Sequence, residues 1–339
     1  MPVYPAAASN ASCATPGCWC RDRVARYPSD LTDQEWEVLR PQAEAVMTEL
    51  RRATGRPMVH DLRAMLDAIG YVVRNGIEWR ALPVDFPPWE AVYAFFQRWS
   101  QRGLPQRLTE RLRAGLRRGM GRQAQPSAAI VDSQSVKAAE WVGASSRGFD
   151  SGKKINGRKR HIAVDVEGFL LAVVVTAANI GDRMGAKLLV IALLNTLTRL
   201  KLIWADAGYD GTPLSEWVRS VAHITVQIIK RTEAHTFRVL PRRWVVERSF
   251  GWLLRYRRLV RDYERQPAHH EAMVYWATVL IMTRRLARRT TDPPLTQRWG
   301  QPRPAVSRTD PAAACTLYQQ ALRRRAAVRR NRSRHHCPR

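Results

Sequence analysis

The chain has 339 residues, of which 45% are apolar, so it is long enough for a buried core and too apolar for wholesale disorder. Its 56 basic residues against 29 acidic residues give a formal net charge of +27, and only seven of the basic residues are lysines. This excess of arginine indicates a polyanionic partner, most directly nucleic acid. The longest apolar runs, at 169–175 and 188–194, are too short for a transmembrane helix, and none is expected.

The two ends differ in composition from the middle of the chain. Residues 1–26 lack periodicity and the pattern of a secretory signal, so we expect a loose extension there. Residues 289–339 hold 12 arginines against two aspartates, which predicts a basic, disordered tail. The cysteines lie only in these ends and form no disulfide framework, which favours a reducing cytoplasm. A zinc site formed by Cys13, Cys18 and Cys20 is the alternative.

Residues 27–120 are expected to be helical. Helices are predicted over 33–47, over 60–76 and from Trp89 onward. Ser29 or Thr32 is placed to cap the first helix, a glycine ends the second, and a Pro-Pro break precedes the third. On a basic chain, such short helices fit a helix-turn-helix DNA-binding domain or a plain helical bundle.

Residues 125–288 show a different pattern, in which apolar strands alternate with helices. Strands are predicted over 127–134, 200–208 and 223–229, with two more in 160–179 around a tight turn at Glu167–Gly168. Helices are predicted over 183–197, 212–221, 242–265 and 270–288. Parallel strands joined by helices, preceded by a hairpin, predict an α/β domain with a mixed sheet flanked by helices.

Three carboxylates lie at positions that suit a catalytic or metal-binding role. Asp132 and Asp206 each close an apolar strand, and reactive groups gather at strand ends in open α/β sheets. Glu247 lies on the long helix among arginines, which fits either a metal ligand flanked by phosphate contacts or an ordinary solvated face. Carboxylates from separate elements suit Mg²⁺, and two such ions can cleave a phosphodiester. The competing acids are Asp150, Asp165, Asp182, Asp210, Asp262 and Glu264.

Other catalytic classes leave no signature. The chain has no GxxxxGK[ST] phosphate loop, no GxGxxG after a strand, no GxSxG elbow and no HExxH helix. His161 is expected to be a packed or solvated strand residue, and His269 and His270 are expected at the surface.

Several segments together resemble the IS5-type insertion-sequence transposases of the DDE group. The resemblance covers roughly residues 27–288, and its joint occurrence is more specific than any single motif. The segments that carry it are YPSDLTDQEWEVLRP (27–41), the run from Gly55 to Trp99, AAIVDSQSVKAAE (128–140), GKKINGRKRHIAVDVEG (152–168), LIWADAGYDG (202–211) and RRWVVERSFGWLLRYRRLVRDYER (242–265).

The resemblance implies an RNase H-like catalytic domain over 125–288. It also implies that Asp132, Asp206 and Glu247 bind two Mg²⁺ or Mn²⁺ ions, with Asp132 shared between them. An activated water would free a 3′-OH at the element end, and this 3′-OH would attack target DNA. Related transposases carry a Tyr-(2)-Arg-(3)-Glu-(6)-Lys pattern, which this chain matches at Arg243 but not at Leu240 or Leu254. Arg255 or Arg258 is a candidate replacement for the lysine.

Two basic groups are predicted to contact the DNA backbone, although a solvated turn would also explain the first. They are the run Lys153, Lys154, Arg158, Lys159 and Arg160 beside the hairpin, and Arg243, Arg255, Arg258 and Arg261 on the long helix. Recognition of the element ends is assigned to the helical region, with Arg80, Arg98 and Arg102 as candidates.

The sequence thus predicts a bacterial, cytoplasmic, nucleoid-associated DNA transposase that joins two element ends as a homodimer or larger assembly. Two alternatives are a catalytically silent or domesticated protein that occupies element ends, and a general nucleic-acid binder driven by the arginine-rich tail.

Overall fold

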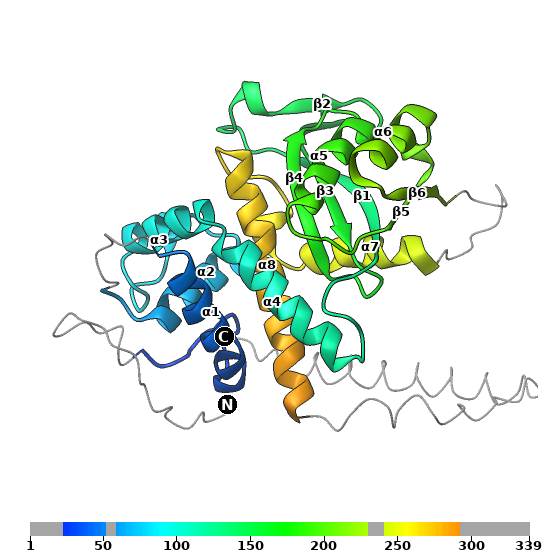
Figure 1. Ribbon diagram of the computed structural model, residues 1–339. Helices are drawn as coiled ribbons and strands as arrows, with labels where there is room; N and C mark the ends of the chain where they lie inside the picture. Colours follow the sequence, from blue (N-terminus) through cyan, green and yellow to red (C-terminus); the bar gives the residue numbers. More distant parts are fainter. Residues whose placement is uncertain (1–22, 52–58, 230–240, 292–339) are drawn as a thin grey trace, which may run out of the picture. The chain divides into compact units, whose positions relative to one another are not determined.

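The computed structural model describes residues 23–51, 59–229 and 241–291. The five cysteines, residues 1–22 of the expected extension and residues 292–339 of the expected tail lie outside the described residues. Among the described residues, no helix is both long and apolar enough to cross a membrane. Figure 1 shows a group of helices followed by a sheet with helices on both faces.

The three helices predicted before residue 120 are present as α1 (Asp33–Glu49), α2 (Leu62–Asn75) and α3 (Trp89–Gln101). The structure adds the short 3-10 helix η2 (Trp79–Ala81) and the helix α4 (Leu104–Gly119). Thr32 caps α1 in a reciprocal capping box with Glu35, as the sequence allowed. Gly76 ends α2 with φ of 72°, a left-handed conformation that glycine adopts without steric cost.

The second part of the described chain is a mixed sheet with its helices. The strands are β1 (Ala128–Lys137), β2 (Gly148–Asp150), β3 (Ile155–Val164), β4 (Leu170–Ala177), β5 (Leu202–Ala205) and β6 (Thr225–Ile228). The strand order is β2-β3-β1-β5-β6, and β4 also pairs with β3. Strand β3 is antiparallel to β1, β2 and β4, whereas β5 is parallel to β1 and β6. This arrangement confirms the predicted mixed α/β fold, with β2 as an addition.

The helices of this part are α5 (Asp182–Leu194), α6 (Thr212–Ala222), α7 (Pro241–Leu253) and α8 (Pro267–Thr291), with 3-10 turns η3 (Ala144–Ser146), η4 (Ala207–Tyr209) and η5 (Arg257–Leu259). Alternate strand residues divide between two hydrophobic clusters, because successive side chains point to opposite faces. Ala129 and Val131 pack toward α5 and α6, whereas Ile130 packs in the cluster that contains α7 and α8.

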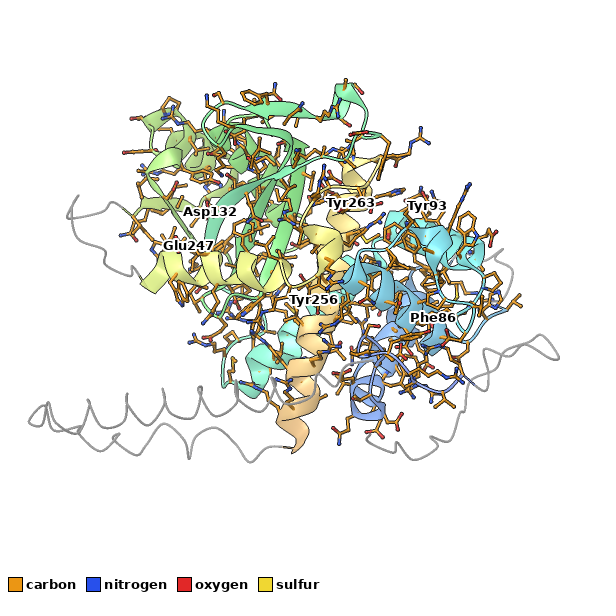
Figure 2. The ribbon with its side chains drawn as sticks, turned by 180° about the vertical axis from the view of Figure 1, so that it is seen from behind. Phe86, Tyr93, Asp132, Glu247, Tyr256 and Tyr263 are labelled. Atoms are coloured by element: carbon orange, nitrogen blue, oxygen red, sulfur yellow. The ribbon has the colours of Figure 1, made fainter. Side chains whose placement is uncertain are left out.

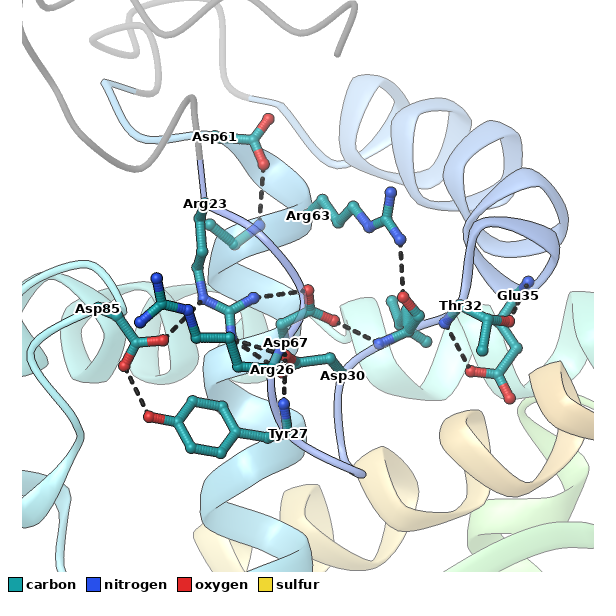
Figure 3. A network of polar contacts seen from close by, with 12 residues as sticks. Arg23, Arg26, Tyr27, Asp30, Thr32, Glu35, Asp61, Arg63, Asp67 and Asp85 are labelled. Atoms are coloured by element: carbon teal, nitrogen blue, oxygen red, sulfur yellow. Dashed lines mark hydrogen bonds and ion pairs between the residues drawn. The ribbon is translucent and has the colours of Figure 1, made fainter. Parts of the chain in front are cut away.

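Helix α8 joins the helical region to the sheet. One continuous hydrophobic cluster contains buried residues of α1 to α4, of α7 and α8, and of one sheet face, so the core does not divide near residue 120. Close to the start of the described chain, Arg23 forms ion pairs with three acids, Asp30, Asp67 and Asp85 (Figure 3). These pairs fix the segment before α1 onto α2 and the loop before α3.

The predicted long helix over 242–265 is wrong, because α7 ends at Leu253. Beyond η5, the chain instead pairs with the end of β1. The Asp262 N–H donates to the carbonyl of Lys137 at 2.9 Å, and the Ala139 N–H donates to the carbonyl of Asp262 at 2.8 Å. His269 and His270 are buried rather than at the surface, and His270 Nδ1 lies 3.0 Å from an Asp262 carboxylate oxygen.

Candidate active site

Asp132 and Asp206 each lie two residues beyond the paired part of the neighbouring parallel strands β1 and β5. Ala128, Ala129 and Ile130 of β1 pair with Leu202, Ile203 and Trp204 of β5. Asp206 directly follows β5 as the N-cap of η4. Strand β5 ends at Ala205, whereas β1 continues to Lys137, so Asp132 lies within its strand and does not close it as predicted.

Helix α7 packs on β1 and carries Glu247. Val246, Phe250 and Leu253 are the buried face of α7, and they share a cluster with Ile130 of β1. Asp132 is two residues after Ile130 and therefore projects from the same face of the sheet. Glu247 is exposed, one residue from the buried face, and Figure 2 shows it beside Asp132. The turn between β3 and β4 holds α7 in place, because Ser249 Oγ donates to the Gly168 carbonyl at 3.0 Å.

These acids fit the donor chemistry of Mg²⁺ in part. Within 23–51, 59–229 and 241–291, no three His, Cys, Asp or Glu side chains are gathered closely enough to hold a metal ion. Protein-bound Mg²⁺ is usually held by one or two carboxylates, with waters and a substrate phosphate completing its shell. Asp132 and Asp206, each two residues beyond the paired part of β1 and β5, match that requirement, and Glu247 lies on α7, which packs on β1.

A polar network lies on the opposite face of β1, next to Asp132. The Ser133 N–H donates to Asp132 Oδ1 at 2.7 Å, and Ser133 Oγ donates to Asp182 Oδ1 at 2.7 Å. Lys159 Nζ donates to the same Asp182 oxygen at 3.1 Å. Asp182 is the first residue of α5. The α5 helix is therefore tied to the residue that directly follows Asp132.

Carboxylate oxygens of Asp182 and Asp206 both lie near Gly208 of η4. A Cβ placed on Gly208 would lie 3.1 Å from Asp206 Oδ1 and 3.8 Å from Asp182 Oδ2. Burial, followed by the charges of Asp132 and Asp182, raises the pKa of the Tyr209 phenol, and Asp206 contributes in the same direction. The charges of three carboxylates, from β1, α5 and the residue after β5, therefore all raise the pKa of one buried tyrosine.

The basic run beside the hairpin divides between the two faces of the sheet. Arg158 and Arg160 are fully buried on the face opposite Lys159. Arg158 donates to Asp262 and to the carbonyls of Glu264 and Arg265, whereas Arg160 donates to the Leu259 carbonyl and to Gln134. Neither guanidinium is accessible to a phosphate, so the DNA contact predicted for these two arginines is wrong.

The remaining predicted contacts differ in accessibility. Lys153 and Lys154 are exposed, and Lys153 Nζ donates to the Ser133 carbonyl at 3.4 Å. Lys159 is 6% exposed, with its ammonium held by Asp182, so it lies inside the site rather than on a surface. Lys153 and Lys154 are thus the accessible cations of this run.

The arginines predicted on the long helix no longer share one stripe, because that helix ends early. Arg255 is exposed and Arg261 is half-buried, with Nη2 3.3 Å from the Ala138 carbonyl. Arg258 is buried and donates to Glu264 and to the Ile77 carbonyl, which contradicts its predicted DNA contact. The side chain of Arg243 lies outside the described part of the structure. Of the two candidates for the missing lysine, Arg255 is the accessible one.

The arginines proposed for end recognition lie on the helical region. Arg80 and Arg98 are exposed, and Arg102 is half-buried. The guanidiniums of Arg80 and Arg102 stack over Trp89 and Trp99, with the carbon 5.3 and 5.2 Å from the ring centroids. Both side chains are therefore held in place by neighbouring aromatic rings.

Of the competing acids, three are buried in ion pairs and one lies near Asp206. Asp165, Asp262 and Glu264 are buried in ion pairs with Arg117, Arg158 and Arg258, respectively. Asp182 instead lies beside Asp206, and sequence reasoning missed its link to Ser133. The available signal was the alternation along β1, which places Ser133 and Ser135 on the face opposite Asp132.

Comparison with known proteins identifies transposase families in both parts of the chain. Residues 123–282 match the family described as "Transposase DDE domain", and residues 31–109 match "Putative transposase of IS4/5 family". The chain is 33% identical over 139 residues to a Burkholderia cepacia protein named "Putative transposase for insertion sequence element IS402". That alignment covers 39% of this chain and 65% of the relative, which is just under two thirds of its length. These matches support an insertion-sequence transposase.

Proposed function

We propose that this chain, whose two parts match transposase families, is a DNA transposase that cuts and joins DNA at the ends of an insertion sequence. The observation that carries the proposal is the parallel pairing of β1 with β5, which places Asp132 and Asp206 each two residues beyond the last paired residues, Ile130 and Trp204, inside the segment that matches the DDE domain. We further propose that the sheet is RNase H-like, which its three long antiparallel strands followed by two parallel strands support.

In this proposal, Asp132, Asp206 and Glu247 hold two divalent ions, Mg²⁺ or Mn²⁺. When bound, such ions activate a nucleophilic oxygen and neutralise the charge that develops on a phosphodiester. The protein's own residues position these acids. Asp132 keeps its position through the Ser133 N–H, and α7 sets Glu247 against β1 through the buried contacts of Val246 and Phe250.

The net positive charge supplies sequence-independent attraction to the DNA backbone. We assign backbone contact to the accessible cations Lys153, Lys154 and Arg255, with Arg261 and Arg243 as further candidates. We assign end recognition to the helical region, where Arg80 and Arg102 are held on aromatic rings. Joining two ends requires two active sites, so we propose at least a dimer on DNA.

The proposal is tested by incubating the protein with Mg²⁺ and linear DNA that carries the sequences flanking its own gene. We expect cuts at the element boundary that leave 3′-OH ends and that Asp206→Asn abolishes. Specific binding without cuts, in both Mg²⁺ and Mn²⁺, would instead support the alternative of a catalytically silent protein that occupies element ends.

A further inference from the structure

We propose that Asp182 is a positioning residue of the active site, which acts through Ser133 to hold the carboxylate of Asp132. This role depends on the proposed function, because it concerns the acids assigned to metal binding. The evidence for it is a set of contacts within and between α5, β1 and β3 next to those acids.

The first step is the backbone link between Ser133 and Asp132. The Ser133 N–H is 2.7 Å from Asp132 Oδ1, a short hydrogen bond to a charged acceptor. The direction of this hydrogen bond depends on the orientation of the peptide bond between Asp132 and Ser133. A side chain that fixes Ser133 therefore also fixes the carboxylate of Asp132.

The second step is the anchor on Ser133. Its hydroxyl is 2.7 Å from Asp182 Oδ1, and the Ser133 side chain is buried on the α5 face of the sheet. Asp182 is held in turn by Lys159 on β3, at 3.1 Å from the same oxygen. The Lys159 ammonium thus compensates the negative charge of Asp182 at one oxygen. The two hydrogen bonds of this oxygen join α5 to β1 and β3.

The third step is the place of the second Asp182 oxygen. Asp182 Oδ2 lies on the side of Gly208 that also faces Asp206 Oδ1. Asp182 is therefore linked to Asp132 through Ser133, and its second oxygen lies near Gly208, as does Asp206 Oδ1. The ring of His161 also packs directly against α5 at Gly185, where an added Cβ would lie 2.0 Å from that ring. This close contact keeps the first turn of α5 against the sheet.

The strand offers a matched control two residues away. Ser135 lies on the same face of β1 and donates its hydroxyl to Asp150 at 2.5 Å. Ser135→Ala therefore removes an equivalent buried hydroxyl–carboxylate hydrogen bond without touching the residue next to Asp132. Ser133→Thr keeps the hydroxyl and suits a strand, so it serves as the conservative replacement.

The test measures Mn²⁺ affinity of the full chain without DNA, by electron paramagnetic resonance of free Mn²⁺, together with thermal stability. We expect Ser133→Ala and Asp182→Ala to weaken Mn²⁺ binding at least 10-fold, as Asp132→Asn does. We expect Ser133→Thr to restore most of the affinity and Ser135→Ala to stay within about 2-fold of the wild type. A structural role alone would lower the melting temperature of the two serine-to-alanine variants alike and leave Mn²⁺ affinity unchanged.

Cleavage of element-end DNA by the same variants separates this inference from the proposed function. If Ser133→Ala binds Mn²⁺ and cuts DNA as the wild type does, the positioning role is wrong and the transposase proposal stands. If the wild type does not cut but its Mn²⁺ affinity depends on Ser133 and Asp182, the positioning role stands and the proposed function fails. If Asp132→Asn leaves Mn²⁺ binding unchanged, Asp132 holds no ion and the positioning role is overturned.

Discussion

Arg158 on β3 and Asp262 beyond η5 form an ion pair of 2.8 Å in which both side chains are completely buried. The interactions of His270 and Arg158, which outweigh the effect of burial, lower the pKa of Asp262 to about 2. The pair joins β3, an inner strand of the sheet, to the segment that leads into α8. A residue from a run that looked like a DNA contact is thus part of the core.

Removing one partner of this pair should destabilise the protein strongly. Because the remaining charge would stay buried without its partner, we expect Arg158→Ala or Asp262→Ala to lower the free energy of unfolding by about 3–5 kcal/mol. The exposed pair Arg40–Glu44 on α1 is the control, and Arg40→Ala should cost less than about 1 kcal/mol. Urea unfolding measures both. Equal effects of the buried and exposed substitutions would contradict the structural role of Arg158.

Glu271 on α8 predicts a pH dependence of stability. Burial raises the pKa of Glu271 to about 7, although its Oε1 accepts the Val175 N–H at 2.8 Å. Because its pKa is raised in the folded state, Glu271 contributes to the free energy of unfolding fully below the unfolded-state pKa near 4.5. This contribution is lost as the pH rises through 7.

Glu271→Gln keeps a hydrogen-bond acceptor for Val175 and removes the titration. We expect the difference in free energy of unfolding, Glu271→Gln minus wild type, to be larger at pH 8 than at pH 5 by about 1–3 kcal/mol. Denaturant unfolding at the two pH values measures this difference. The comparison cancels the parallel contribution of Asp67, whose pKa burial also raises to about 7. A difference that is the same at both pH values would show that Glu271 titrates normally.

Accessible and buried cations should differ in their effect on DNA binding. Lys154→Ala and Arg255→Ala should each weaken binding evenly across sequences and reduce the slope of log affinity against log salt by about 1. Fluorescence anisotropy with two unrelated duplexes over a salt series measures the slope. If either substitution changes the preference between the duplexes while the slope stays constant, that residue is not a backbone contact.

The fold was predictable where local pattern and tertiary structure agree. The cap at Thr32, the end of α2 at Gly76 and the hairpin turn at Gly168 each follow from residue type, and all were found. The parallel pairing of β1 and β5 followed from two apolar strands joined by a helix, and the position of Asp206 directly after β5 was visible in the sequence. Asp132 was expected at the end of its strand and instead lies within β1.

The rest depended on contacts between distant segments. The helical pattern over 242–265 was overridden because Asp262 pairs with the end of β1, which no local signal encodes. Arg158 and Arg160 carry the charge of surface residues, and only their position on the inner face of β3 shows that they are buried. Likewise, the Ser133–Asp182 hydrogen bond joins residues 49 positions apart.

In the proposed active site, acids from three separate elements act as one catalytic group, and Glu247 is the sharpest probe because it comes from a helix and not from β1 or the end of β5. We would measure cleavage of element-end DNA in Mg²⁺ by Glu247→Gln and by Glu216→Gln, an exposed glutamate on α6, with mapping of the 3′-OH ends. We expect Glu247→Gln to bind the ends but make no cuts, while Glu216→Gln cuts as the wild type does. Cutting by Glu247→Gln at the wild-type rate would show that Glu247 is not part of the catalytic group.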